Sequence, residues 1–260
     1  MSAVLAAACL LGAAACGEDR RSDPAQRRAV VVMPVPEGPE LTARTAAAAA
    51  ADATTVAWLG GFDSNDTAVA LPLLNAAGVA VVSPSAAATS LTAADPEFPG
   101  APAKYYPQAE IYGRTFARTV AADPQLASEV LAAAGRSGVR SVFAVDAGDT
   151  DGVAFSSAIE REARSAGVRF LGRAAVTEGE DDWEGLLTRI GEAGADAIAW
   201  GSDPGETSSQ LWRAVAALRN PPVLIAGPAM TERAMERLAL RRVRSWWVTG
   251  AVPAAGDAPA

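Results

Sequence analysis

With 260 residues, half of them hydrophobic, the chain is long enough to form one large domain or two lobes of ordinary size. Its net charge is −8 and its arginines are scattered, which excludes the concentrated positive face that nucleic-acid binding requires. Histidine is absent, so the usual general base and the commonest transition-metal ligand are both missing.

The N-terminal segment Val4–Ala15 is apolar and rich in small residues. At about 12 residues it is too short to span a bilayer, but it suits the hydrophobic region of a signal peptide. Alanines stand directly before Cys16, as in a bacterial lipobox, in which the cysteine is lipidated. We therefore predict that residues 1–28 are a signal peptide and linker, and that Cys16 anchors an exported lipoprotein on the outer face of the cytoplasmic membrane. An ordinary secretory leader and a buried helix remain alternatives.

From Ala29 onward, short β-branched runs alternate with Ala- and Leu-rich amphipathic stretches, a pattern that predicts alternating strands and helices. The predicted strands are Ala29–Met33, Thr55–Leu59, Val79–Val82, Val139–Val145, Val168–Ala174, Ala197–Trp200, Val223–Ala226 and Ser245–Val248. The predicted helices are Glu40–Ala53, Asp66–Ala77, Pro124–Ala134, Gly152–Ala166, Asp182–Glu192, Glu206–Leu218 and Thr231–Leu240.

The clearest helix covers residues 182–192 and begins at Asp181 or Asp182, either of which can serve as its N-cap. Its apolar residues lie on one face with helical spacing, at Trp183, Leu186, Leu187 and Ile190. Glycines follow the last periodic residue of four helices, where a left-handed residue is favoured, at Gly78, Gly135, Gly167 and Gly194.

Nearly all-apolar strands that alternate with helices predict an α/β fold, with two lobes built on parallel sheets. The long irregular segment Ser83–Tyr112 is rich in Pro and Ala, and we expect it to form functional loops. We place the boundary between the lobes at Asp123-Pro124. The prediction is an N-terminal lobe at 29–123, a C-terminal lobe at 124–250 and a tail at 251–260.

Ligands of open parallel sheets bind beyond the carboxyl ends of the strands, and this rule selects four loops. The loops are Gly60–Asn65, Ser83–Thr89, Asp146–Gly152 and Trp200–Pro204. In the first, Asp63, Ser64 or Asn65 can cap the following helix, whose free N–H groups would attract a carboxylate. A routine capped turn between strand and helix is the alternative.

The acids of the loop from Asp146 to Gly152 lack the spacing and the terminal glutamate of an EF-hand, so we interpret them as solvated turn residues rather than calcium ligands. The sequence contains no G-x-S-x-G, no P-loop, no G-x-G-x-x-G and no metal-ligand cluster. Nothing in the sequence therefore argues for an enzyme, and we predict that the chain has no catalytic activity, no cofactor and no metal.

Two stretches then resemble a known family. Val56–Thr92 is similar to its strand, serine loop, helix, strand and Ser-Pro loop, and Gly179–Gly201 to a helix–strand stretch of its second lobe. From about Ala29 to Gly250 the chain resembles the branched-chain amino-acid-binding (Leu/Ile/Val-binding) proteins of ABC transporters, which are type I periplasmic binding proteins. The resemblance implies two Rossmann-like lobes that close on a small ligand.

The four loops and the resemblance together give the candidate ligand-binding residues Asp63, Ser64, Ser85, Ala87, Asp149, Ser202, Asp203 and Ala229, of which Asp63 and Ser202 come from the loops alone. Ser64 matches the family serine and Ser85 a residue that offers its backbone, and both would hold a ligand carboxylate. Ala87 stands where a hydroxyl is usual. Ala229 stands where the ammonium-binding glutamate is expected, so that Asp149 or Asp203 would have to replace it.

The partners that the resemblance implies are a small amino-acid-like solute and an ABC permease in the membrane. The family's first βα unit and the end of its second lobe have no counterpart in the sequence, so we expect a truncated member. The alternative is a surface sensory or interaction protein that keeps a degenerate binding fold and does not serve transport.

Overall fold

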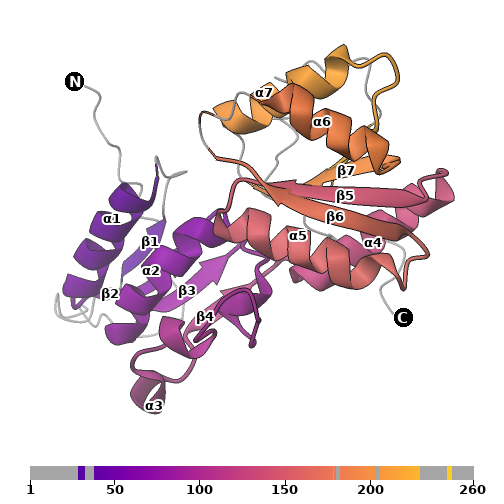
Figure 1. Ribbon diagram of the computed structural model, residues 1–260. Helices are drawn as coiled ribbons and strands as arrows, with labels where there is room; N and C mark the ends of the chain where they lie inside the picture. Colours follow the sequence, from indigo (N-terminus) through magenta and orange to yellow (C-terminus); the bar gives the residue numbers. More distant parts are fainter. Residues whose placement is uncertain are drawn as a thin grey trace, which may run out of the picture.

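The computed structural model describes residues 29–32, 38–177, 179, 182–202, 205–228 and 245–247. These residues form two lobes, each built on a parallel β-sheet (Figure 1). The N-terminal sheet has the strand order β1-β2-β3-β4, and the C-terminal sheet has the order β6-β5-β7-β8-β9. The predicted α/β fold with two parallel-sheet lobes is therefore confirmed, while the boundary at 123–124 stays a prediction.

In chain order, the elements of the N-terminal lobe are β1 (Ala29–Val32), α1 (Pro39–Ala51), β2 (Thr55–Leu59), α2 (Ser64–Ala76), β3 (Ala80–Ser83), η2 (Thr89–Leu91), η3 (Ala103–Tyr105), α3 (Ala109–Tyr112) and β4 (Phe116–Arg118). Those of the C-terminal lobe are α4 (Asp123–Arg136), β5 (Ser141–Asp146), α5 (Thr150–Ala163), β6 (Arg169–Ala175), α6 (Trp183–Glu192), β7 (Ala197–Trp200), α7 (Glu206–Ala217), β8 (Val223–Ala226) and β9 (Ser245–Trp247). The predicted helix Thr231–Leu240, Met33 and Val248 lie outside the described residues.

The segment that we expected to be irregular, Ser83–Tyr112, contains the short helices η2, η3 and α3. The strand β4 that follows was missed, because its sequence Phe-Ala-Arg has no β-branched run. It becomes a strand by pairing with β3, where Val81 lies opposite Phe116. Tertiary pairing therefore decides this element.

Helix ends follow the sequence closely. Asp63, Asp149 and Asp182 are the N-caps of α2, α5 and α6, and each accepts a hydrogen bond from a backbone N–H three residues later. Gly78, Gly167 and Gly194 have φ of 71°, 71° and 74°, as predicted for residues just beyond a helix. Gly135 was predicted wrongly: it lies inside α4, and the left-handed residue beyond that helix is Gly138, with φ 98°.

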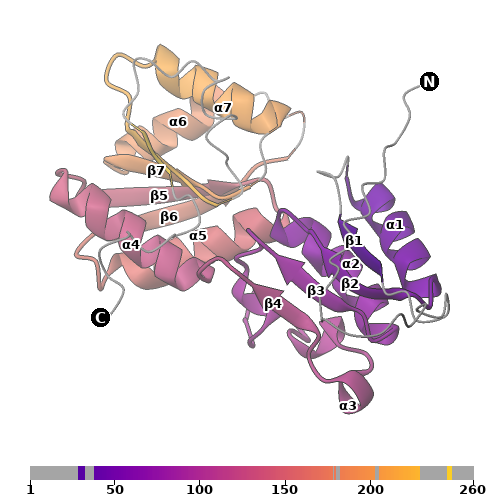
Figure 2. The same ribbon diagram turned by 180° about the vertical axis from the view of Figure 1, so that it is seen from behind.

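The strand order of the C-terminal sheet reverses at β5. Strand β6 lies on one side of β5, whereas β7, β8 and β9 follow one another on the other side. Helices α4 and α5 cover one face of this sheet and α6 and α7 the other (Figures 1 and 2). Each face has its own buried cluster, with Phe155 and Ile159 on one side and Trp200 and Trp212 on the other. Such a reversal leaves a crevice at the carboxyl ends of the two strands, where ligands bind.

The apolar face of α6 is confirmed, since Leu186, Leu187 and Ile190 are all buried. None of the helices in the described part of the chain has the length and apolarity that crossing a membrane would require.

Candidate functional site

The N-termini of α2 and α5 meet between the two lobes. The Asp151 carboxylate accepts hydrogen bonds from the backbone N–H groups of Ser64, at 2.7 Å, and Asn65, at 3.1 Å. In return, the Asn65 side-chain oxygen accepts a hydrogen bond from the Thr150 N–H at 2.5 Å. Each helix therefore supplies a side-chain acceptor to the free N–H groups of the other.

The hydroxyls of the predicted serine loops join two loops of the N-terminal lobe. Ser64 Oγ accepts a hydrogen bond from the Ala88 N–H at 3.0 Å, and Ser83 Oγ donates to the Gly61 carbonyl. Ser85 Oγ donates to the Phe62 carbonyl at 2.5 Å. These bonds fix the loop after β2 against the loop after β3, at the edge of the sheet where the resemblance places a ligand.

Ala87, the residue that stands in place of a hydroxyl, is fully buried beside Val120 and Leu126. Its carbonyl accepts a hydrogen bond from the Asp123 N–H at 3.0 Å. A methyl group suits these apolar neighbours, whereas a hydroxyl there would need a partner of its own. In this structure Ala87 therefore packs the loop against the start of α4.

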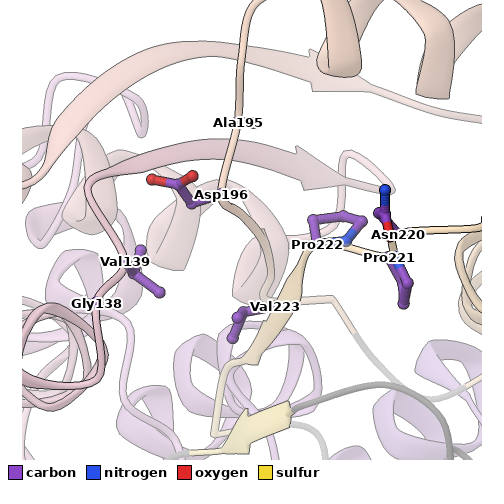
Figure 3. A pocket seen from close by; sticks show the side chains of 8 residues that line it. All are labelled: Gly138, Val139, Ala195, Asp196, Asn220, Pro221, Pro222 and Val223. Carbon is purple, nitrogen blue, oxygen red and sulfur yellow. The ribbon is translucent and has the colours of Figure 1, made fainter.

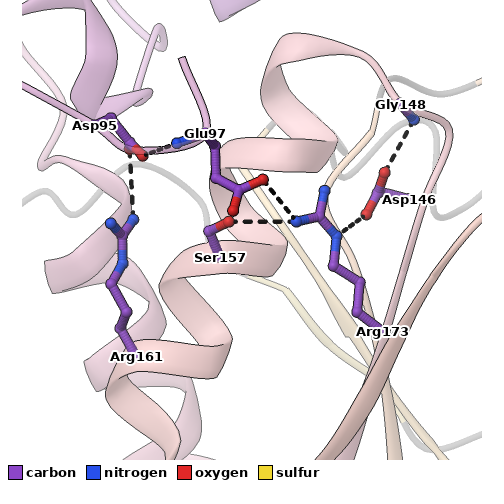
Figure 4. A network of polar contacts seen from close by, with 7 residues as sticks. All are labelled: Asp95, Glu97, Asp146, Gly148, Ser157, Arg161 and Arg173. Carbon is purple, nitrogen blue, oxygen red and sulfur yellow. Dashed lines mark hydrogen bonds and ion pairs between the residues drawn. The ribbon is translucent and has the colours of Figure 1, made fainter. Parts of the chain in front are cut away.

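Two of the three acids in the loop Asp146–Gly152, Asp146 and Asp151, are buried and are therefore not the solvated turn residues that we predicted. Asp146 is fully buried and accepts hydrogen bonds from Arg173 Nε at 2.7 Å and from the Gly148 N–H at 3.0 Å (Figure 4). Asp151 is 2% exposed. Periodicity could not reveal this burial, because it depends on residues of β6 and of the opposite lobe.

Ser202 lies at the same edge of the C-terminal sheet. It is fully buried, and its hydroxyl accepts a hydrogen bond from the Ala147 N–H at 2.8 Å. A side chain at Gly152 would meet both the Ser202 hydroxyl and the Asp149 carboxylate, so a glycine is needed where α5 passes these loops. Ser202 thus joins the loops after β5 and β7.

Two ion pairs also connect the lobes, both from the long loop after β3 (Figure 4). Asp95 pairs with Arg161 of α5 at 3.5 Å, and Glu97 pairs with Arg173 of β6 at 3.3 Å. Arg161 and Glu97 are about two-fifths exposed, so solvent screens both pairs and each stabilises the contact only weakly. Burial alone would lower the pKa of Arg173, but the hydrogen bond and charge of Asp146 raise it.

A buried acid stands where the chain passes from β4 to α4. Burial is the main cause and raises the pKa of Asp123 to about 7. The negative charge of Asp95 adds to this rise, and the positive charges of Arg118 and Arg161 oppose it, Arg118 more strongly. The Asp123 Oδ2 atom is buried without a hydrogen-bond partner among the described residues. Arg118 is itself partly buried, and desolvation lowers its pKa.

This raised pKa predicts that stability falls as pH rises. An unfolded aspartate ionises near pH 4, so between pH 4 and 7 the folded chain holds a proton that the unfolded chain releases. The free energy of unfolding should therefore decrease by a few kcal/mol across this interval, at about 1.4 kcal/mol per pKa unit. Urea unfolding of wild type and Asp123→Asn at pH 5 and pH 8 should show a smaller pH dependence in the variant. If the free energy of unfolding changed by the same amount between pH 5 and pH 8 in the two proteins, Asp123 would not be the group with the raised pKa.

A cavity of about 570 Å³ opens where α2 and α5 meet. Residues of both lobes line it: Pro39, Asn65, Ala68, Val69, Phe98, Lys104, Tyr105, Gly148, Asp149 and Thr150. Most of this lining is apolar, and Lys104 and Asp149 are its charged side chains. Lys104 Nζ lies 5.1 Å from the centre of the Tyr105 ring and 5.8 Å from that of Phe98. Size and lining are those of a small-molecule site.

A second hollow, of about 250 Å³, lies at the amino ends of β5, β7 and β8 (Figure 3). None of the predicted ligand-binding residues lines it. Its acid, Asp196, accepts hydrogen bonds from the Arg140 N–H at 2.8 Å and the Ser141 hydroxyl at 3.1 Å. Asp196 thus fixes the start of β5, at the edge of the sheet opposite the predicted ligand-binding loops.

The structure therefore brings Ser64 of the N-terminal lobe close to the loop that contains Asp149. Cys16, Asp203 and Ala229 lie outside the described residues. Sequence reasoning missed the role of Asp151 and the lining by Phe98, Lys104 and Tyr105. The aromatic residues Phe98 and Tyr105 could have indicated this lining, since aromatic side chains in a long loop often pack the loop onto the fold. No group of acids or cysteines in the described part of the chain could hold a metal ion.

Comparison with known proteins agrees with this architecture. Residues 36–260 match the family model described as "Periplasmic binding protein". Similar solved structures include a substrate-binding protein from Desulfitobacterium hafniense in complex with Leu, with 19% identity, TM-score 0.58, and coverage of 76% of this chain and 54% of that one. A leucine-binding protein from Thermotoga maritima has 19% identity and TM-score 0.59, with coverage of 77% and 52%.

A solute-binding protein from Rhodopseudomonas palustris in complex with p-hydroxybenzoic acid has 17% identity and TM-score 0.60, with coverage of 78% of this chain and 52% of that one. The chain thus spans about half the length of the solved structures that it matches. No curated protein sequence matches it significantly. At these identities the solved structures establish a shared fold.

Proposed function

Because the chain belongs to the periplasmic binding protein family, we propose that it is the extracytoplasmic solute-binding protein of an ABC uptake system. It binds a small amino-acid-like solute between its lobes and delivers that solute to a membrane permease. A lipid on Cys16 keeps the protein at the outer face of the cytoplasmic membrane.

The observation that carries this proposal is the cavity between the lobes. Its apolar walls suit a side chain, and its two charged residues have opposite signs. Lys104 would attract a carboxylate, and Asp149 would attract an ammonium group. A zwitterionic amino acid matches this pair of charges, and Asp149 would take the part of the acid that Ala229 cannot supply. Leucine, the ligand in one of the similar structures, has this chemistry.

Asp149 provides the test. In Asp149→Asn the side chain still caps α5, because asparagine is an equally good N-cap, but the negative charge is removed. Isothermal titration should show that wild type binds at least one amino acid from a panel that includes leucine. The variant should bind that amino acid about tenfold or more weakly, which corresponds to roughly 1.4 kcal/mol.

The matched control is Asp182→Asn, which alters the N-cap of α6 and should leave binding unchanged. A carboxylate without an ammonium group, such as 4-hydroxybenzoate, should not distinguish wild type from Asp149→Asn. A folded wild type that binds no member of the panel would contradict the proposed function. Equal affinities in wild type and Asp149→Asn would contradict the role of Asp149.

Two observations favour the sensory alternative. The N–H groups of Ser64 and Asn65 lie in the loop where the resemblance places the carboxylate of a solute, but they donate to Asp151. Ala87 packs in an apolar cluster and offers no hydroxyl. Genes for a permease and an ATPase beside this one would support transport. A kinase or regulator gene in their place would support sensing.

A further inference from the structure

The contact between α2 and α5 has an electrostatic problem that the chain solves with its own side chains. The N-terminus of a helix carries a partial positive charge of about half an elementary charge, so two N-termini that face each other repel. Here Ser64 and Thr150 are the first residues of the two helices, and they come from different lobes. An anion between these ends turns the repulsion into attraction.

Every N–H group of the first turn of α2 has an identified acceptor. Asp151 accepts from Ser64 and Asn65, Asp63 Oδ1 accepts from Asp66 at 2.6 Å, and the Thr67 N–H already makes the first helical hydrogen bond. The cap within the lobe thus serves one group, and the opposite lobe serves two. Without Asp151, the N–H groups of Ser64 and Asn65 would lose their acceptor at the junction between the lobes.

Burial makes the contact strong. Asp151 is 2% exposed and Ser64 is fully buried, so water screens their charge-assisted hydrogen bonds little. The ion pairs from Asp95 and Glu97, in contrast, each include a side chain that is about two-fifths exposed. Among the described polar contacts between the lobes, the one through Asp151 combines burial, charge and two donors.

We propose that Asp151 is a carboxylate latch: it fills the anion-binding N-terminus of α2 and so holds the lobes together when no solute is present. The proposal concerns the ligand-free chain and stands apart from the proposed function. One consequence for ligands follows. Any small carboxylate that binds the N–H groups of Ser64 and Asn65 must displace Asp151 and release the latch.

Amide hydrogen exchange of the full chain, followed by NMR, tests the latch residue by residue. In Asp151→Ala, exchange at Ser64 and Asn65 should rise about tenfold or more, as expected for the loss of hydrogen bonds to a charged group. Exchange at Thr150 should rise as well. Its hydrogen bond to Asn65 is not altered by the substitution, so its exposure reports separation of the lobes.

Adding sodium acetate to Asp151→Ala should restore protection at Ser64 and Asn65, whereas sodium chloride at the same ionic strength should not. Asp182→Ala, which removes a capping aspartate of α6 within one lobe, is the control and should leave all three amides unchanged. Amides of β8 serve as an internal reference for folding. If they also exchange faster in Asp151→Ala, the exchange at Ser64, Asn65 and Thr150 is compared with that of the β8 amides in the same variant, and only the excess over β8 counts for the latch.

Unchanged exchange at Ser64 and Asn65 would overturn the proposal, as would acetate that protects no better than chloride. Loss of protection at these two amides with Thr150 still protected would show that Asp151 caps α2 without holding the lobes, and this result too would overturn the latch.

Discussion

Replacing Arg118 with methionine should lower the free energy of unfolding by about 3–5 kcal/mol, because the change removes three hydrogen bonds donated by a charged, partly buried guanidinium. The guanidinium donates to the carbonyls of Ala86 and Ala88, each at 3.1 Å, and to Thr92 Oγ1 at 2.6 Å. Methionine keeps much of the length but donates to none of these acceptors, and the Ala88 carbonyl keeps only its longer hydrogen bond from the Leu91 N–H at 3.3 Å. It also removes the positive charge that lowers the pKa of Asp123, so this pKa should rise further.

Urea unfolding at pH 7 measures the Arg118 effect, and Arg114→Met is its control. Arg114 also reaches Thr92, through the carbonyl at 2.8 Å, but its side chain is exposed. Its removal should cost less than about 1 kcal/mol, as surface substitutions usually do. Similar losses in the two variants would show that Arg118 is not the residue that holds the loop after β3.

Replacing Trp200 with alanine should cost about 3–5 kcal/mol as well, through the cavity that remains in the C-terminal lobe. Trp200 is the last residue of β7 and is fully buried. Its ring meets that of Trp212 edge to face, with centroids 6.1 Å apart. Its Nε1–H donates to the Ser202 carbonyl at 3.0 Å, so the loss should also loosen the loop after β7.

Thermal and urea unfolding check the Trp200 prediction. Trp183→Ala is the comparison, since that tryptophan is only half-buried at the start of α6 and should cost clearly less. Trp200→Phe keeps most of the packing and removes the hydrogen bond to Ser202. If Trp200→Ala were no more destabilising than Trp183→Ala, the edge-to-face pair would not be a centre of the core.

Much of the secondary structure was predictable because it depends on neighbours in the sequence. The apolar face of α6 follows from spacing alone, and its Asp182 cap from residue type. Gly135 shows the limit of such signals. A glycine near a helix end predicts its termination, but α4 continues because Leu131 and Ala134 are buried against the sheet and α5. Strand β4 shows the same limit, since its pairing partner is distant in the sequence.

The site divides in the same way. Residue pattern was enough to predict that loops with Ser64 and Asp149 follow parallel strands and that aspartates cap the helices after them, because both properties depend on adjacent residues. In contrast, the contact of Asp151 with the helix of the other lobe follows from the packing of the two lobes, since in the sequence Asp151 is an ordinary acid of a first helical turn. The burial of Asp146, Asp123 and Ala87 was decided by the tertiary structure too. Burial and contacts between lobes arise from how separate segments pack, and no local pattern of residues records that packing.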